Sequence, residues 1–146
     1  MKLSRMFVLL FLMMAVVPCF AHHMAVVVNK DNHVADVTTS HLAHICRLET
    51  RKWPDGKDVL LVLHKNSLGE SATLEHLTGM SAPELKAFMA SHKDSLTLAD
   101  SDADLLRIVE TTPGAVGLVD VRAINDQVNV LRVGGKLPME DGYLSH

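Results

Sequence analysis

A short stretch rich in hydrogen-bond donors, 64-HKNSLGES-71, follows an apolar run and precedes a short amphipathic segment. It contains a lysine, an asparagine, two serines and a glycine. A glycine-containing turn that opens a helix directs free backbone N–H groups and the positive end of the helix dipole at one point. The hydroxyl groups add neutral donors. The stretch therefore predicts an oxyanion-binding turn, with Lys65, Asn66, Ser67 and Ser71 as the candidate ligands.

A structural interpretation of the same stretch is also open. Ser67 or Ser71 would then cap the following helix, and the remaining residues would form a solvated connection between a strand and that helix. Lys65 would act as a point charge, since lysine cannot grip an oxyanion bidentately as arginine does. Glu70 places a carboxylate beside the candidate ligands, where it would repel a dianion unless it points away. The direction of Glu70 therefore bears on both interpretations.

The elements that must position this turn alternate between strands and helices. Continuous apolar runs predict strands buried on both faces, and a run that alternates with polar residues predicts an edge strand. The buried strands are predicted at 24–29, 59–64 and 115–120, and the edge strand at 127–133. The tail 134–146 is rich in Gly and Pro and predicts irregular structure.

Helix signals lie between these strands. Ser40, Ser81 and Ser101 are predicted N-caps, and Ser81 forms a capping box with Glu84. Gly79 is predicted to close a short helix. The helices are expected at 41–49, 70–79, 82–92 and 102–112. This order predicts an α/β fold, with a mostly parallel sheet flanked by helices.

The first 21 residues have the pattern of a secretory signal. Lys2 and Arg5 provide a positive segment, and the apolar run 6–20 is short for a transmembrane helix. Cleavage near Ala21 would leave one domain, residues 22–146, with 12 basic and 17 acidic residues and a net charge of −5. An exported protein of this charge has no general attraction for nucleic acid or anionic lipid, and we expect no membrane insertion after cleavage.

Other chemistry has weaker signals. His41 and His44 share a helix face, but Cys46 lies far round the helix from His41, so the three cannot easily bind one metal ion. We therefore expect solvated histidines, a buried Cys46, and no metal or cofactor. The chain has no Gly-x-Ser-x-Gly elbow, no phosphate loop ending in Lys-Ser/Thr and no His-Glu-x-x-His motif, so catalysis is not expected. Trp53, beside Pro54, is interpreted as a packing anchor.

Six segments, taken in order, resemble the phosphate-binding branch of the periplasmic substrate-binding proteins of ABC importers. They are 25-AVVVN-29, 39-TSHLAHI-45, 53-WPDG-56, 79-GMSAPELKAF-88, 101-SDADLLRIVETTPGAVGLVD-120 and 133-VGGKLPMEDGYLSH-146. The resemblance covers nearly all of residues 22–146. It implies a single lobe of a type 2 periplasmic-binding-protein-like fold, whereas full receptors hold an oxyanion in the cleft between two lobes.

The resemblance also implies a function. In the family, the strand matching 59–64 is followed by a turn that reads roughly Arg-x-x-Ser-Gly-Thr and holds the oxyanion. Here His64 or Lys65 occupies the position of the arginine. The implied protein is an exported, periplasmic solute-binding-like protein for phosphate or another oxyanion, with a second copy or another protein closing the cleft. The alternative is a periplasmic interaction or accessory module that has lost solute binding.

Overall fold

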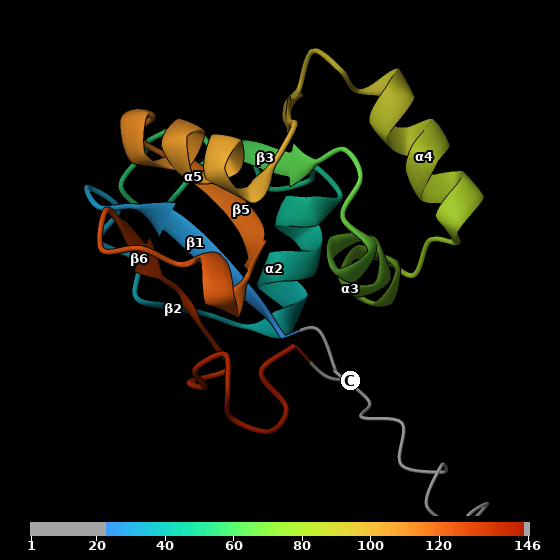
Figure 1. The fold of residues 1–146 in the computed structure, drawn as a ribbon. Helices are drawn as coiled ribbons and strands as arrows, with labels where there is room; N and C mark the ends of the chain where they lie inside the picture. Colours follow the sequence, from blue (N-terminus) through green and yellow to red (C-terminus); the bar gives the residue numbers. More distant parts are fainter. Residues whose placement is uncertain (1–22, 145–146) are drawn as a thin grey trace, which may run out of the picture.

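The computed structural model describes residues 23–144 (Figure 1). The predicted signal peptide, residues 1–21, lies outside the described residues. The elements are β1 (Met24–Asn29), β2 (Asp36–Val37), α2 (Thr39–Cys46), β3 (Leu60–His64), α3 (Leu68–Thr78), α4 (Ala82–Ser91), β4 (Leu96–Ala99), α5 (Asp102–Thr111), β5 (Ala115–Asp120), the 3-10 helix η1 (Val121–Ala123), β6 (Val128–Val130) and β7 (Arg132–Val133). No helix within residues 23–144 has the length and apolarity needed to cross a membrane.

The main sheet has five strands in the order β4-β3-β5-β1-β6. Strand β3 runs parallel to both β4 and β5, whereas β1 is antiparallel to β5 and β6. Four of the five strands therefore point the same way, which confirms the predicted α/β fold with a mostly parallel sheet. Strand β6 lies at one edge, as expected, and the short strands β2 and β7 form a separate parallel pair.

Both faces of the sheet are covered. Val26 and Val28 of β1 belong to a core shared with Leu42 of α2 and Leu74 of α3. Val27, between them, faces the other side and packs in a core with the apolar residues of α5. Alternate residues of one strand thus pack against opposite layers, which explains the continuous apolar run at 24–29. Helix α4 extends beyond α3 at the periphery (Figure 1), and Leu85 is its buried residue.

Most of the predicted helix boundaries are confirmed. Ser81 and Ser101 are N-caps, the capping box at Ser81 is complete, and Gly79 ends α3 in the left-handed conformation. The prediction for Ser40 is wrong, because the hydroxyl of Thr38 accepts the backbone N–H three residues later at 3.0 Å and starts α2 there. Both residues have cap-forming side chains, and Thr38 is the one with extended backbone angles.

Trp53 is a packing anchor, as interpreted from the sequence. Its side chain is buried, and its indole N–H donates to the carbonyl oxygen of Gly114 at 2.8 Å. Gly114 has a φ of +84°, and a Cβ there would lie 2.1 Å from the backbone oxygen of Asp58. Only glycine therefore lets the start of β5 approach the segment that leads into β3.

Two short strands, β2 and β4, were not predicted, and the predicted strand 127–133 is divided at Leu131. The hydroxyl of Tyr143 lies in this gap: it accepts the N–H of Val26 at 3.2 Å and donates to the carbonyl oxygen of Leu131 at 2.5 Å. The chain then leaves the main sheet as β7 to pair with β2. The tail is irregular as predicted, but its residues Tyr143 and Leu144 are buried in the core.

We predict that Tyr143→Phe lowers the free energy of unfolding by about 1–3 kcal/mol, because it leaves the N–H of Val26 and the carbonyl of Leu131 without their buried partner. Urea unfolding followed by circular dichroism measures this. Met139→Ala serves as the control, since Met139 is 67% exposed in the same tail. An unfolding midpoint that is equal in Tyr143→Phe and wild type would contradict the role assigned to this hydroxyl.

Candidate oxyanion site

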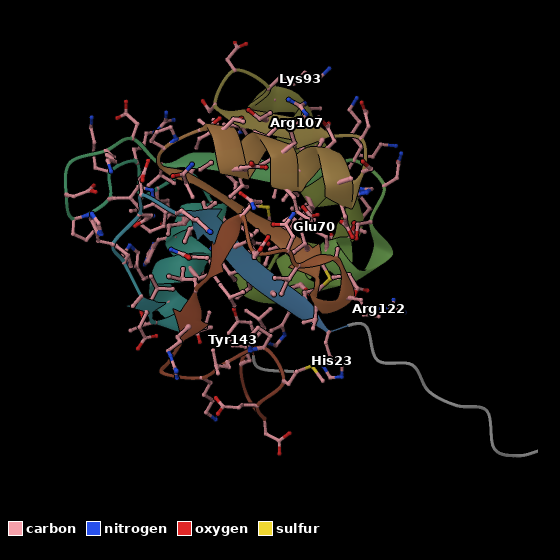
Figure 2. All side chains as sticks on the ribbon, turned by 60° about the vertical axis from the view of Figure 1, so that its left-hand side comes forward. His23, Glu70, Lys93, Arg107, Arg122 and Tyr143 are labelled. Carbon is pink, nitrogen blue, oxygen red and sulfur yellow. The ribbon has the colours of Figure 1, made fainter. Side chains whose placement is uncertain are left out.

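The carboxyl group of Glu70 points into the protein. Its side chain is 1% exposed, and its two oxygens accept the backbone N–H of His64 at 2.9 and 3.0 Å. Figure 2 shows Glu70 in the interior, whereas Lys93 lies at the surface. Because the carboxyl group turns toward the end of β3, it does not oppose an anion in the way that an exposed carboxylate would.

Burial also changes the charge of Glu70. Desolvation raises the pKa of Glu70 to about 8, the nearby Asp102 acts in the same direction, and the hydrogen bond from His64 opposes it. The carboxyl group is therefore largely protonated at neutral pH. A neutral buried acid adds little negative potential to the turn in front of it.

Ser67 is the N-cap of α3. Its hydroxyl oxygen accepts the backbone N–H of Glu70 at 3.2 Å. The pair has the spacing of a capping box, but the Glu70 side chain extends past Ser67 to the strand end at His64. The structural interpretation of Ser67 is thus confirmed, and its part in binding an anion stays a prediction.

Two backbone N–H groups of the turn are already paired within the protein. The N–H of Lys65 donates to the carbonyl of Ala99 at 3.0 Å and extends the pairing of β3 with β4. The N–H of Asn66 donates to Nδ1 of His64, also at 3.0 Å. The anion cradle expected from backbone amides is therefore reduced at these two residues, and the candidate donors are mainly side chains.

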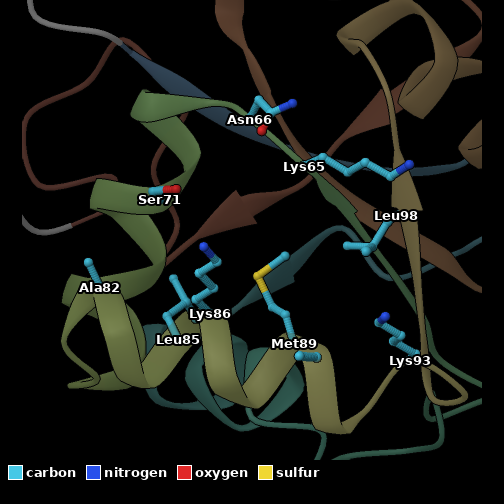
Figure 3. Close-up of a pocket in the computed structure, with 10 residues that line it drawn as sticks. Lys65, Asn66, Ser71, Ala82, Leu85, Lys86, Met89, Lys93 and Leu98 are labelled. Carbon is cyan, nitrogen blue, oxygen red and sulfur yellow. The ribbon is translucent and has the colours of Figure 1, made fainter.

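Three of the four predicted ligands line one pocket of about 400 Å³ (Figure 3). The pocket lies between the β3–α3 turn, helix α4 and strand β4. Its described lining residues are Lys65, Asn66, Ser71, Ala82, Leu85, Lys86, Met89, Ala90, Lys93 and Leu98. None of these ten is acidic, and three are lysines. Ser67 is not among them.

Sequence reasoning did not identify Lys86 and Lys93. They come from α4 and the turn after it, and they lie on the same side as Leu85 and Met89. Leu85, Lys86 and Met89, at positions i, i+1 and i+4, share one face of α4, and Lys93 follows the end of the helix. The sequence therefore contains the pattern of this helix face. The pattern does not show which part of the protein the face packs against, so the lysines could not be assigned to a pocket.

Lys65 has a partner outside the pocket lining. Its Nζ atom lies 2.9 Å from Oδ1 of Asp100, and this carboxylate raises the pKa of Lys65. Both side chains are substantially exposed. Exposed ion pairs contribute little to stability, so a ligand anion would compete with Asp100 at little cost.

The histidine hypothesis gains no support from the described residues. His44 pairs with Glu49, and Cys46 is buried, where desolvation followed by the nearby Glu70 raises the thiol pKa to about 12. Within residues 23–144 no three His, Cys, Asp or Glu side chains are grouped so that they could hold a metal ion. Cys46 is a buried apolar residue, as expected.

We predict that Glu70→Gln removes a pH dependence of stability. The pKa is about 8 in the folded state and near 4.5 for an ordinary glutamate, so between these values the folded protein keeps a proton that the unfolded chain has lost. The stabilisation is complete below about pH 4.5 and disappears as the pH rises through 8, with a slope of at most about 1.4 kcal/mol per pH unit. Glutamine remains neutral and can still accept the N–H of His64.

Urea unfolding between pH 5 and pH 8 measures this difference. The wild type should lose more stability over the range than Glu70→Gln does. Glu75→Gln, on the same helix, is the matched control and should follow the wild-type slope. If all three proteins show the same slope, Glu70 is ionised in the folded state and its assignment as a neutral buried acid is wrong.

The fold is similar to those of phosphate receptors whose structures have been solved. An ABC-type phosphate transport receptor from Vibrio cholerae matches with a TM-score of 0.68 and 20% identity, over 84% of this chain and 52% of the receptor. A proposed phosphate ABC transporter substrate-binding protein from Clostridium perfringens, solved with bound phosphate, matches with a TM-score of 0.65 and 20% identity, over 80% and 46%. The phosphate-binding protein of Stenotrophomonas maltophilia matches with a TM-score of 0.65 and 18% identity, over 80% and 40%.

No family model matches the chain, and no curated protein matches it significantly. The likeness to the solved receptors is at or below 20% identity and concerns the fold. This chain spans about half the length of each receptor. It therefore has the fold of about one lobe of a phosphate-type ABC-importer receptor, as the resemblance in its sequence implied.

Proposed function

We propose that this protein is an exported, single-lobe solute-binding protein that holds phosphate or a related oxyanion in the pocket between the β3–α3 turn and α4. The charge of the pocket carries the proposal. Lys65, Lys86 and Lys93 line it together with the neutral donors Asn66 and Ser71, and its described lining has no carboxylate. Of the nearby acids, Glu70 faces the core, and Asp100 pairs with Lys65 outside the lining.

The position of the pocket in the fold supports the proposal. Lys65 and Asn66 directly follow the carboxyl end of β3, next to the parallel strand β4. Ligands of open α/β sheets bind outside the carboxyl ends of their strands. Ser71 lies in the first turn of α3, where the helix dipole favours an anion. The local positive charge contrasts with the net negative charge of the whole chain.

The similar structures support the same class of function. They are named as phosphate receptors or phosphate-binding proteins, and one of them contains phosphate. No enzyme is among these three. The expectation from the sequence that this chain does not catalyse a reaction agrees with these three proteins. It stays a prediction that a second copy of this chain, or another periplasmic protein, covers the pocket.

Isothermal titration of the purified protein with inorganic phosphate and with sulfate tests the proposal. We predict that Lys86→Gln weakens the binding of either ion about tenfold, which corresponds to about 1.4 kcal/mol, because it removes one cation from the pocket. Lys52→Gln is the matched control, since Lys52 is exposed and pairs with Asp58 just before β3 begins. The absence of both binding heat and thermal stabilisation at millimolar ligand would refute the proposed function.

Export has a separate test. Cells that express the full chain should release the protein with the periplasmic fraction, and N-terminal sequencing of that protein should begin at His22. Replacing Val8 and Leu9 by aspartate should block processing, because charges interrupt the apolar segment of a signal. Replacing the exposed Lys52 by aspartate should leave processing unchanged. A full-length protein that remains in the cytoplasm would contradict the assignment of residues 1–21.

A further inference from the structure

We infer that the preferred ligand of this pocket is an organic anion, a phosphate monoester with a short apolar group, and not inorganic phosphate. The inference rests on the proposed function, because it assumes that the pocket binds an oxyanion. It concerns the remainder of the pocket, which the oxyanion would not fill.

The size of the pocket is the first argument. Its volume of about 400 Å³ falls in the range of roughly 300–1,000 Å³ that holds drug-sized organic molecules. A phosphate ion has only five non-hydrogen atoms and would occupy a small part of it. A site that selects a free ion encloses that ion closely, whereas this pocket leaves space beside it.

The wall of that space is apolar. Leu85 and Met89 of α4 and Leu98 of β4 line it. In Figure 3 the side chain of Met89 rises from α4, and that of Leu98 extends from β4 toward it. An ion placed between them would lose water without gaining hydrogen bonds, which is unfavourable. An alkyl or aryl group at the same place would bury apolar surface, and methionine adapts well to ligands of different shape.

The charged groups lie beside this wall. Lys86 points from α4 toward the first turn of α3, which carries Ser71, and Lys65 crosses the opposite side of the pocket (Figure 3). The oxyanion of a phosphate monoester would lie near Lys86, Ser71 and Asn66. Its apolar group would then extend between Met89 and Leu98. The pocket thus has one surface for each end of such a ligand.

Titration of the purified protein with hexyl phosphate, inorganic phosphate and 1-hexanol tests this inference. Hexyl phosphate should bind at least tenfold more tightly than inorganic phosphate, because each buried CH₂ strengthens binding about three- to fourfold. It should also bind at least tenfold more tightly than hexanol, which has the same chain and no charge.

The variant Met89→Ser tests the contribution of the apolar end of the ligand separately from that of the charged end. It should weaken the binding of hexyl phosphate at least five times more than it weakens the binding of inorganic phosphate. Met139→Ser, at an exposed position in the tail, is the matched control and should change neither affinity. If Met89→Ser fails to fold, as judged by circular dichroism, Leu98→Thr on β4 provides the same comparison from the other wall.

Four outcomes would count against the inference. Equal affinity for phosphate and hexyl phosphate, or affinities that do not respond to Met89→Ser and Leu98→Thr, would overturn it and leave the proposed oxyanion site intact. Hexanol that binds as tightly as hexyl phosphate would overturn it as well, since the charge would then contribute nothing. Failure of all anions to bind would overturn the proposed function itself.

Discussion

The hydrogen bond between the buried carboxyl group of Glu70 and the backbone N–H of His64 determines the shape of the candidate site. It joins the last residue of β3 to the first turn of α3 and so fixes the turn 65–67 between them. It also keeps an acidic side chain out of a pocket lined by lysines. A buried carboxyl group is costly when ionised and inexpensive when neutral, provided that it is hydrogen-bonded. One side chain thus fixes the geometry of the turn and, because it is buried and largely neutral, adds little negative potential in front of it.

The packing of helix α4 and the shape of the pocket depend on each other. Leu85 is its buried residue, while Met89 is half-buried and Lys86 is exposed. Lys86 of α4 and Lys93 in the turn after it line the pocket together with Lys65, whose charge Asp100 partly neutralises. An anion between these side chains would be attracted to both walls of the pocket. On our proposal, ligand binding and the packing of α4 against β4 and the β3–α3 turn are therefore coupled.

Local signals predicted the local structure well. The apolar runs predicted β1, β3 and β5, and the caps at Ser81 and Ser101 follow from hydrogen bonds between residues three positions apart. One failure is local, because the N-cap of α2 is Thr38 and not Ser40. The other failures concern contacts between distant residues. The strand expected at 127–133 divides because Tyr143 inserts its hydroxyl next to Val26, 117 residues away. No pattern within a short window contains that contact.

In the candidate site, too, the local features could be predicted and the long-range contacts could not. Lys65, Asn66 and Ser71 were predicted from one stretch, and the structure places all three in one pocket. The direction of Glu70 could not be predicted, because a capping-box glutamate normally turns back to its own N-cap and this one extends to the strand. Lys86 and Lys93 were not recognised because their importance depends on where α4 packs, which the amphipathic pattern alone does not specify.

The chain spans about half of the receptors that it resembles, so the source of the pocket walls matters for the proposed function. All ten described lining residues lie between positions 65 and 98, on consecutive elements from the β3–α3 turn to β4. The side walls are thus formed within one segment of this chain, and no residue from a second lobe is needed to assemble the lysines. On our proposal a second chain would therefore act as a cover over a pocket that already has its cations. It would add burial to the ligand, and the choice between a free ion and a phosphate monoester would still be made by α4 and β4.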